Sequence, residues 1–314
     1  MNTGRRTWLV VALVLIAGWI GWQATSSTAP VTLTSGGKAK WKVACTTGMV
    51  ADVVREVGGD HVEITQLMGE GVDPHLYKAS PGDVRILKAS DLVCYSGLHL
   101  EGKLAEILSG MSRTKSTCAL AEHLPKAKLL DNEGNFHDPH VWFDVSLWAE
   151  TVEPVRAALE KLDPAHATEY KERATRYHGE LIKLHAECIE KLGSIPKPRR
   201  VLVTAHDAFR YFGRAYNMEV KAIQGISTEG EAGVKQINDL VKFISENKIK
   251  SVFTESSISE RNMQSLIEGC AQGGHAVARG GELFSDAMGK AGTPAGTYIG
   301  MVRHNVEKIV AGLK

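Results

Sequence analysis

The sequence has no excess of charge of either sign. Its 314 residues include 37 Lys and Arg against 36 Asp and Glu, a formal net charge of +1 at pH 7. A nucleic-acid-binding protein usually needs a surplus of basic side chains to neutralise phosphates, so the balance argues against a nucleic-acid partner. Because 43% of the residues are hydrophobic, the chain can bury a core, and a disordered chain is excluded.

Cysteines are few, and none belongs to a Cys-x-x-Cys pair. The five lie far apart in the sequence, at Cys45, Cys94, Cys118, Cys188 and Cys270. This spacing excludes zinc-ribbon and thioredoxin-type motifs. Since the number is odd, at least one thiol stays unpaired even in an oxidising compartment.

The apolar run at the amino terminus is short for a membrane-spanning helix, which needs about 20 residues. It covers the 15 uncharged residues from Trp8 to Trp22, after the basic pair Arg5-Arg6 and before a small polar stretch. This order is typical of a secretory signal. We therefore expect a signal peptide at 1–24, a tether at 25–40, and a periplasmic or extracellular protein. An uncleaved membrane anchor is the alternative, since tryptophans suit membrane interfaces.

Strand and helix patterns alternate along the rest of the chain. Apolar runs short enough for buried strands are followed by apolar residues at helical spacing. Alternation of this kind predicts parallel sheets flanked by helices, so we expect an α/β protein with two similar lobes, 41–162 and 195–314. Strands are predicted at 41–46, 62–68, 92–95, 201–204, 219–223 and 249–254, and helices at 49–57, 81–89, 100–109, 207–215 and 260–272.

One long helix is predicted between the two lobes. Asp163 is a good N-cap with Pro164 at the first helical position, and Gly193 and Pro196 end the pattern. Apolar residues recur every three or four positions in between. At 1.5 Å per residue the helix would be about 45 Å long, so 163–194 is predicted to join the lobes as a rigid connection.

Three of the 12 histidines have distinctive settings. His75 and His140 each end an Asp-Pro-His tripeptide, and His206 is expected in a loop at the carboxyl end of the strand 201–204. Ligands of open α/β sheets bind beyond the carboxyl ends of strands, and a proline fixes the backbone before a ligand. Because neutral imidazole is the commonest metal ligand in proteins, these three side chains are candidate ligands.

The other histidines have less distinctive settings. His99 and His137 lie in expected loops near a better candidate. The remaining seven are expected to be solvated surface side chains, namely His61, His123, His166, His178, His185, His275 and His304.

A carboxylate in the second lobe would complete a set of four ligands. Three imidazoles with one carboxylate suit Zn²⁺ and, with a bidentate carboxylate, Mn²⁺. Asp286 is best placed, because it follows an apolar pair and precedes a glycine-containing loop. Spacing alone leaves five candidates open, namely Asp207, Glu229, Glu231, Glu255 and Asp286.

Several motifs occur in a fixed order from about Trp41 to Lys314. They are Gly71-Val72-Asp73-Pro74-His75, Asp138-Pro139-His140-Val141-Trp142, Thr204-Ala205-His206, Ile226-Ser227-Thr228-Glu229, Thr254-Glu255-Ser256-Ser257 and Ser285-Asp286. This order resembles the metal-binding solute-binding proteins of zinc and manganese ABC transporters. The resemblance implies two α/β lobes that are joined by one long helix and clamp a metal ion. By this resemblance, His75 and His140 match the first-lobe ligands, His206 the third ligand and Asp286 the carboxylate.

The third ligand position bears on the choice of metal. Family members similar to manganese importers often have Glu there, whereas this sequence has His206. The nitrogen-rich set favours Zn²⁺, for which such sites have a higher affinity than for Mn²⁺. Many zinc members also carry a long His-rich loop before the second ligand. Since 122–138 contains only His123 and His137, Mn²⁺ remains the alternative.

The resemblance implies a binding protein and not an enzyme. We expect a monomer outside the cytoplasm that captures the ion and delivers it to the membrane permease of an ABC importer. A secreted zinc-dependent hydrolase is one alternative, but the sequence has no His-Glu-x-x-His, and four protein ligands would leave no position for an activated water. A metal-binding adhesin without a transporter is another alternative and would share the same site.

Overall fold

The computed structural model describes residues 40–132, 134 and 136–314, of which 40–314 belong to one compact unit. The expected signal peptide, almost all of the tether and the alternative membrane anchor lie outside the described residues. Among the helices in the described part, none is long and apolar enough to cross a membrane.

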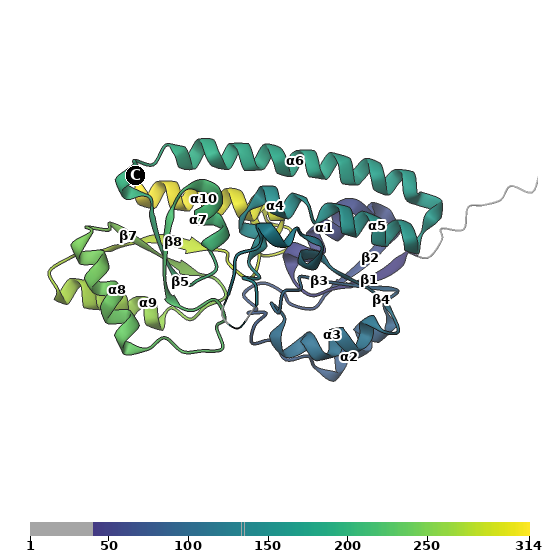
Figure 1. Cartoon of the computed structure of the whole chain (residues 1–314), viewed down its shortest axis with the longest axis horizontal. Helices are drawn as coiled ribbons and strands as arrows, with labels where there is room; N and C mark the ends of the chain where they lie inside the picture. Colours follow the sequence, from purple (N-terminus) through teal and green to yellow (C-terminus); the bar gives the residue numbers. More distant parts are fainter. Residues whose placement is uncertain (1–39, 133, 135) are drawn as a thin grey trace, which may run out of the picture. The chain divides into compact units, whose positions relative to one another are not determined.

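The first lobe contains a four-stranded parallel sheet in the order β2-β1-β3-β4 (Figure 1). The register pairs Val43 with Ile64 on one side and with Leu92 on the other. Most residues of β1 and β3 are buried, as is usual for the central strands of a parallel sheet with both faces covered. The strands are β1 (Trp41–Cys45), β2 (Val62–Gln66), β3 (Leu92–Tyr95) and β4 (Ser116–Ala119).

Helices cover both faces of this sheet. Helix α2 begins with a capping box, in which Ser80 and Asp83 each accept the backbone N–H of the other, and Pro81 occupies the first turn. One face is covered by α1 (Gly48–Gly58) and α5 (Val152–Leu162), and the other by α2 (Pro81–Ala89) and α3 (Ala105–Ser112) (Figure 1).

The second lobe has two parallel pairs of strands, β5-β6 and β7-β8. β5 and β7 lie side by side, but the backbone N–H groups of Ala205 and His206 on β5 donate to the Glu255 carboxylate. Where one continuous sheet was expected, the second lobe thus has two separate strand pairs. The strands are β5 (Val201–His206), β6 (Glu219–Gln224), β7 (Ser251–Glu255) and β8 (Ala278–Leu283), and the helices are α7 (Arg210–Tyr216), α8 (Val234–Glu246), α9 (Arg261–Gln272) and α10 (Tyr298–Leu313).

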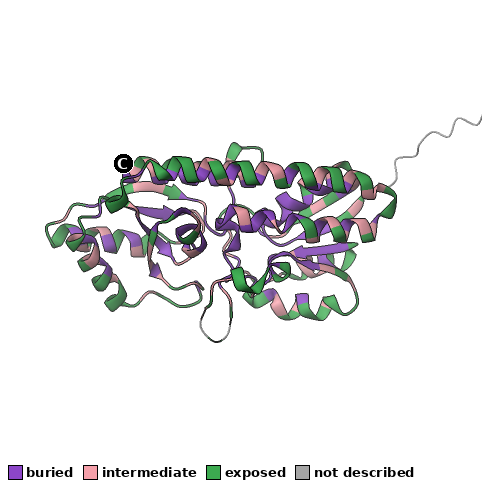
Figure 2. Cartoon of the chain, turned by 45° about the horizontal axis from the view of Figure 1, so that its top comes forward, coloured by how far each residue is buried: buried purple, intermediate pink, exposed green. Residues whose placement is uncertain are grey.

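The long helix α6 (Ala167–Gly193) runs along both lobes, and the α/β fold class with parallel strands is confirmed (Figure 1). The helix begins later than expected, because Pro164–His166 form a 3₁₀ turn. There Asp163 bonds the side chains of His166 and Tyr170 and caps no backbone N–H. Figure 2 shows exposed residues on the outer face of α6. Its buried residues are Tyr170, Ala174, Tyr177, Leu181, Leu184, Cys188 and Leu192.

One hydrophobic core extends from the first lobe along α6 into the second lobe. Asp52 on α1 connects this helix to α6 and α10. Its Oδ2 accepts the hydroxyl of Tyr177 on α6 at 2.9 Å and the backbone N–H of Tyr298 on α10 at 3.1 Å. The Tyr298 hydroxyl donates to the carbonyl of Trp142 at 2.6 Å. This shared core opposes a wide hinge motion of the lobes. The lobe boundaries given above stay predictions.

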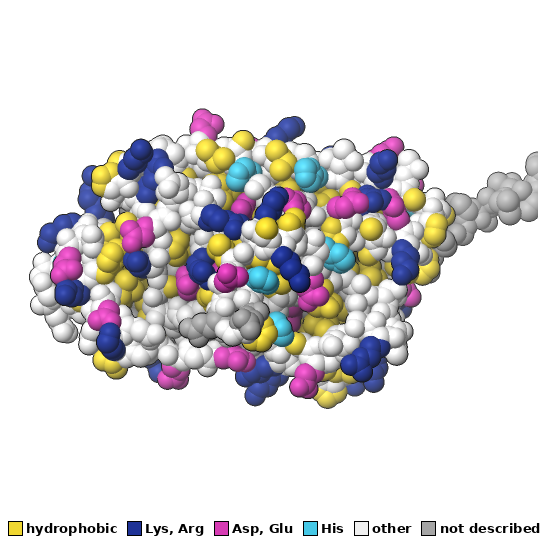
Figure 3. All heavy atoms as spheres, viewed as in Figure 1, with side chains coloured by type: hydrophobic (Ala, Val, Ile, Leu, Met, Phe, Trp, Pro, Cys, Tyr) yellow, Lys and Arg dark blue, Asp and Glu magenta, His cyan; other side chains and the backbone are white. Residues whose placement is uncertain are grey.

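The surface carries charges of both signs. On the face shown in Figure 3, Lys and Arg side chains are interspersed with Asp and Glu, as the balanced composition predicts. All five cysteines are buried and unpaired.

Candidate metal site

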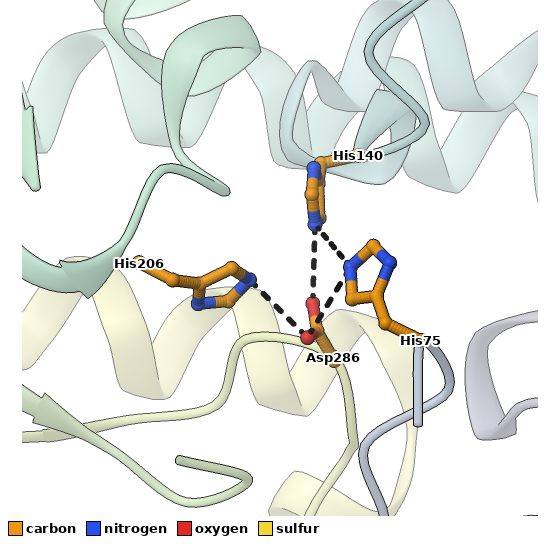
Figure 4. A group of neighbouring side chains, drawn as sticks. All are labelled: His75, His140, His206 and Asp286. Atoms are coloured by element: carbon orange, nitrogen blue, oxygen red, sulfur yellow. Dashed lines mark hydrogen bonds and ion pairs between the residues drawn. The ribbon is translucent and has the colours of Figure 1, made fainter. Parts of the chain in front are cut away.

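Four side chains predicted as ligands converge between the two lobes. His75, His140, His206 and Asp286 each offer one ligand atom, and these atoms all lie within 4.8 Å of one another. Each residue is 4% exposed or less. Figure 4 shows the three rings and the carboxylate directed toward one another. The fold thus brings all four predicted residues together.

The strands place three of these side chains. His75 lies in the turn that follows β2, His206 is the last residue of β5, and Asp286 follows the end of β8. The expected loop position of His206 is wrong, because β5 continues through it. His140 comes directly before a 3₁₀ turn, Val141–Phe143. Carboxyl ends of strands therefore build most of the site, as is usual in open α/β sheets.

The spacing of the donor atoms fits one small ion. His140 Nε2 lies 3.3 Å from His75 Nε2 and 3.4 Å from Asp286 Oδ1. Asp286 Oδ2 lies 3.2 Å from His206 Nε2 and 3.9 Å from His75 Nε2. A tetrahedral zinc ion with bonds of about 2.0–2.1 Å has ligands about 3.3 Å apart. The group is therefore close to the size that such an ion requires.

Three buried polar atoms in this group lack a hydrogen-bond partner among the described residues. They are His206 Nε2 and both carboxylate oxygens of Asp286. Buried polar atoms nearly always have a hydrogen bond, and a buried carboxylate that accepts none is especially costly. A cation bound among these atoms would satisfy all three.

Two carboxylates lie behind the histidine rings. Asp138 Oδ1 lies 2.8 Å from His140 Nδ1, and Glu255 Oε2 lies 2.5 Å from His206 Nδ1. Such contacts fix the ring orientation and leave Nε2 free to face a metal. Sequence reasoning missed both roles. Asp138 could have been found from the Asp-Pro-His tripeptide, whereas Glu255 was considered as a candidate ligand and not as a support for a ligand.

The two Asp-Pro-His tripeptides form the same local turn. Asp73 Oδ1 accepts the backbone N–H of His75 at 2.9 Å, and Asp138 Oδ1 accepts that of His140 at 3.0 Å. The second oxygen of Asp73 does not reach the ring. It accepts the hydroxyl of Thr228, from the second lobe, at 2.6 Å. The turn that carries His75 is thereby linked to the opposite lobe.

The loop that carries Asp286 is also held across the site. The indole N–H of Trp142 donates to the carbonyl of Ser285 at 3.1 Å. The Ser285 hydroxyl lies 2.9 Å from that of Ser257, on the loop after β7. Asp286 is thus positioned by contacts with both lobes.

The charges of the group are strongly coupled. Burial lowers the pKa of His75 to about 4 and keeps the ring neutral. Burial also lowers the pKa of His140, but the hydrogen bond with Asp138 and the nearby negative charge of Asp286 outweigh it and raise the pKa to about 9. Burial raises the pKa of Asp286, but His206 and His140 hold it well below its usual range. The pKa shifts therefore favour a negative charge on Asp286 beside a His140 ring that readily takes up a proton.

The other candidates lie outside this group of four. Burial raises the pKa of Asp207 to about 6, and Glu229 is exposed and pairs with Lys103 at 3.6 Å. Glu231 is exposed, and Glu255 lies behind His206. His99 and His137 line a hollow of about 280 Å³ that also borders His75.

Comparison with known proteins identifies the family. The model of the family described as ZnuA, zinc-uptake complex component A, periplasmic, matches residues 43–312. The chain belongs to this family. It is a metal-binding substrate-binding protein of an ABC importer that works outside the cytoplasm, and it is not an enzyme. The hydrolase alternative is therefore wrong.

Relatives of this family are similar over nearly their whole length. The manganese-binding lipoprotein MntA of Bacillus subtilis is 46% identical over 87% of this chain and 90% of its own. The zinc-binding protein TroA of Treponema pallidum is 48% identical over 86% of this chain and 88% of its own. The structure of periplasmic TroA covers 87% of this chain and 99% of its own, with a TM-score of 0.86 and 47% identity. These lipoprotein and periplasmic names give no support to an uncleaved membrane anchor.

Proposed function

We propose that this protein captures Zn²⁺ through His75, His140, His206 and Asp286 and delivers the ion to the permease of an ABC importer. It would do so as a monomer, in the periplasm or on the outer side of the cell membrane. The observation that carries the proposal is the buried convergence of three imidazole nitrogens and one carboxylate, with three of the atoms unpaired in the described structure.

The donor set favours Zn²⁺ over Mn²⁺. Imidazole suits zinc, whereas manganese is better served by several oxygen ligands. Asp286 is the single carboxylate of the group, and the donor spacing is close to that of a tetrahedral site. Relatives named for manganese and for zinc have nearly equal identity to this chain, so Mn²⁺ is the competitor that the experiment has to include.

Release is best explained by local movement of the turn that carries His75. Asp138 and Glu255 fix the rings of His140 and His206, whereas the carboxylate of Asp73 bonds Thr228 and the backbone of His75. Since the shared core opposes wide separation of the lobes, breaking the contact between Asp73 and Thr228 would free one ligand with little other change.

Calorimetric titration of the metal-free protein with Zn²⁺ and Mn²⁺ tests the ligand set. We expect one tight equivalent of Zn²⁺ and weaker binding of Mn²⁺. His206→Ala and Asp286→Asn should weaken tight zinc binding at least about 100-fold, since the first removes a ligand and the second removes the charge of the group's single carboxylate. His178→Ala, on the exposed surface of α6, is the matched control. Tight binding that survives both ligand substitutions would overturn the assignment.

Delivery can be tested in the source cell. Deletion of the gene should lower zinc accumulation in zinc-poor medium, and the wild-type gene should restore it. The Asp286→Asn gene should not restore it, although the protein is made. If that variant restores zinc accumulation fully, the site does not serve transport.

A further inference from the structure

A second group of metal-ligating side chains lies on the first lobe, away from the central site. His61, His166 and Glu169 each offer a ligand atom, and these atoms lie within 4.8 Å of one another. His61 directly precedes β2, whereas His75 follows the same strand. A strand of five residues spans about 17 Å, so the two groups lie at opposite edges of the sheet.

His166 is oriented in the same way as the central ligand His140. Its Nδ1 lies 2.6 Å from Asp163 Oδ2, which also accepts the hydroxyl of Tyr170 at 3.0 Å. The Asp163 side chain is only 3% exposed. A buried carboxylate behind Nδ1 fixes the ring and leaves Nε2 to bind an ion. His166 thus has the support that histidine ligands of metals usually have.

His61 and Glu169 complete the group from two different elements. His61 Nε2 lies 2.9 Å from Glu169 Oε2, in the first turn of α6, and its ring stacks on that of His166 with centroids 3.9 Å apart. The side chains of His61, His166 and Glu169 are 22%, 28% and 47% exposed. This exposure lets an ion enter and lets the rings turn from the stack toward it.

We propose that His61, His166 and Glu169 bind a second Zn²⁺, with water in the remaining coordination position. Two histidines and a glutamate are a known donor set of open zinc sites. The bound ion would connect the start of β2 to the first turn of α6 and so stabilise the joint between the first lobe and the connecting helix. This role is separate from the capture of transported metal.

The second site should be weaker than the central one. It has three protein ligands in place of four, and they are partly exposed. In addition, the Arg173 guanidinium lies 2.9 Å from Glu169 Oε2 and competes with the ion for this oxygen. Removing that charge should strengthen zinc binding here, up to about five-fold as for a surface ion pair.

The test is a zinc titration of the full chain after one equivalent of Zn²⁺ has filled the central site. We expect a second, weaker equivalent that His166→Ala and Glu169→Gln each weaken at least about tenfold. It should persist in His178→Ala, from the same helix, and become tighter in Arg173→Gln. The added zinc should also raise the Tm of the wild type but not that of Glu169→Gln.

Two results would overturn the second site. One is a zinc stoichiometry of one in the wild-type chain, and the other is a second equivalent that both substitutions leave unchanged. Failure of the proposed function is a different result, namely tight binding that remains in Asp286→Asn. A chain with that substitution should still bind the weaker equivalent, so the two proposals stand or fall separately.

Discussion

The carboxylate of Glu255 lies behind the ring of His206, with Oε2 2.5 Å from Nδ1. Its other oxygen accepts the backbone N–H groups of Ala205 and His206 at 2.7 and 2.9 Å. One buried side chain therefore fixes both the ring and the strand end that carries it. β5 and β7 are not paired as neighbouring strands of one sheet.

Glu255→Gln should weaken zinc binding about 10- to 100-fold, because a carboxylate that supports a ligand contributes that much to affinity. The loss should be smaller than that caused by removing His206 itself. Calorimetry with Zn²⁺ measures it, and Glu246→Gln, at the exposed end of α8, is the control. An affinity equal to that of the wild type would show that Glu255 does not support the ligand.

Thr228→Val should speed the release of zinc. The substitution removes the hydroxyl that links the second lobe to Asp73 and so frees the turn that carries His75. A hydrogen bond to a charged group contributes about 1.5–3 kcal/mol, so we expect the dissociation rate to rise at least about tenfold. Stopped-flow mixing with a chelator measures this rate. Thr175→Val, on the exposed face of α6, should leave it unchanged, and an unchanged rate in Thr228→Val would contradict the release route.

The sequence was sufficient to select the three histidines of the central group. The strand that leads to His206 and the Asp-Pro-His tripeptides of His75 and His140 are local features, and the fold keeps them. The carboxylate was harder to choose, because Glu255 ends β7 and Asp286 lies shortly after the neighbouring strand β8. The register pairs Glu255, the last residue of β7, with Leu283, the last residue of β8. Asp286 therefore lies three residues beyond the end of β8. This small difference places the Asp286 carboxylate among the three converging imidazoles and the Glu255 carboxylate behind the ring of His206.

The second group could not be predicted from the sequence. His61 and His166 looked like ordinary surface histidines, since each stands among charged or helical residues. The contact between His61 and Glu169 joins positions 108 residues apart, and no local pattern marks it. Strand β8 was missed for a different reason: its glycines and exposed residues do not form an apolar run, so only pairing with β7 defines it.

Tyr177→Phe should destabilise the protein by about 1–3 kcal/mol, because it deprives the buried Asp52 carboxylate of a hydrogen-bond donor. Asp52 joins α1, α6 and α10, so the loss should affect both lobes in one transition. Urea unfolding of the metal-free protein, followed by circular dichroism, measures the change. A free energy of unfolding equal to that of the wild type would show that the hydrogen bond between Tyr177 and Asp52 contributes nothing to stability.

The same carboxylate should give stability a defined dependence on pH. Burial raises the pKa of Asp52, although bonds from Tyr298 and Tyr177 oppose the shift. A raised pKa means that the folded state disfavours the charged form, so at neutral pH the ionised Asp52 contributes less to stability than the protonated side chain would. As the pH falls through the raised value, the folded protein takes up a proton before the unfolded chain does, and this penalty is relieved. The free energy of unfolding of Asp52→Asn minus that of the wild type should therefore decrease between about pH 7 and pH 4. A difference that is constant over this range would contradict the assignment.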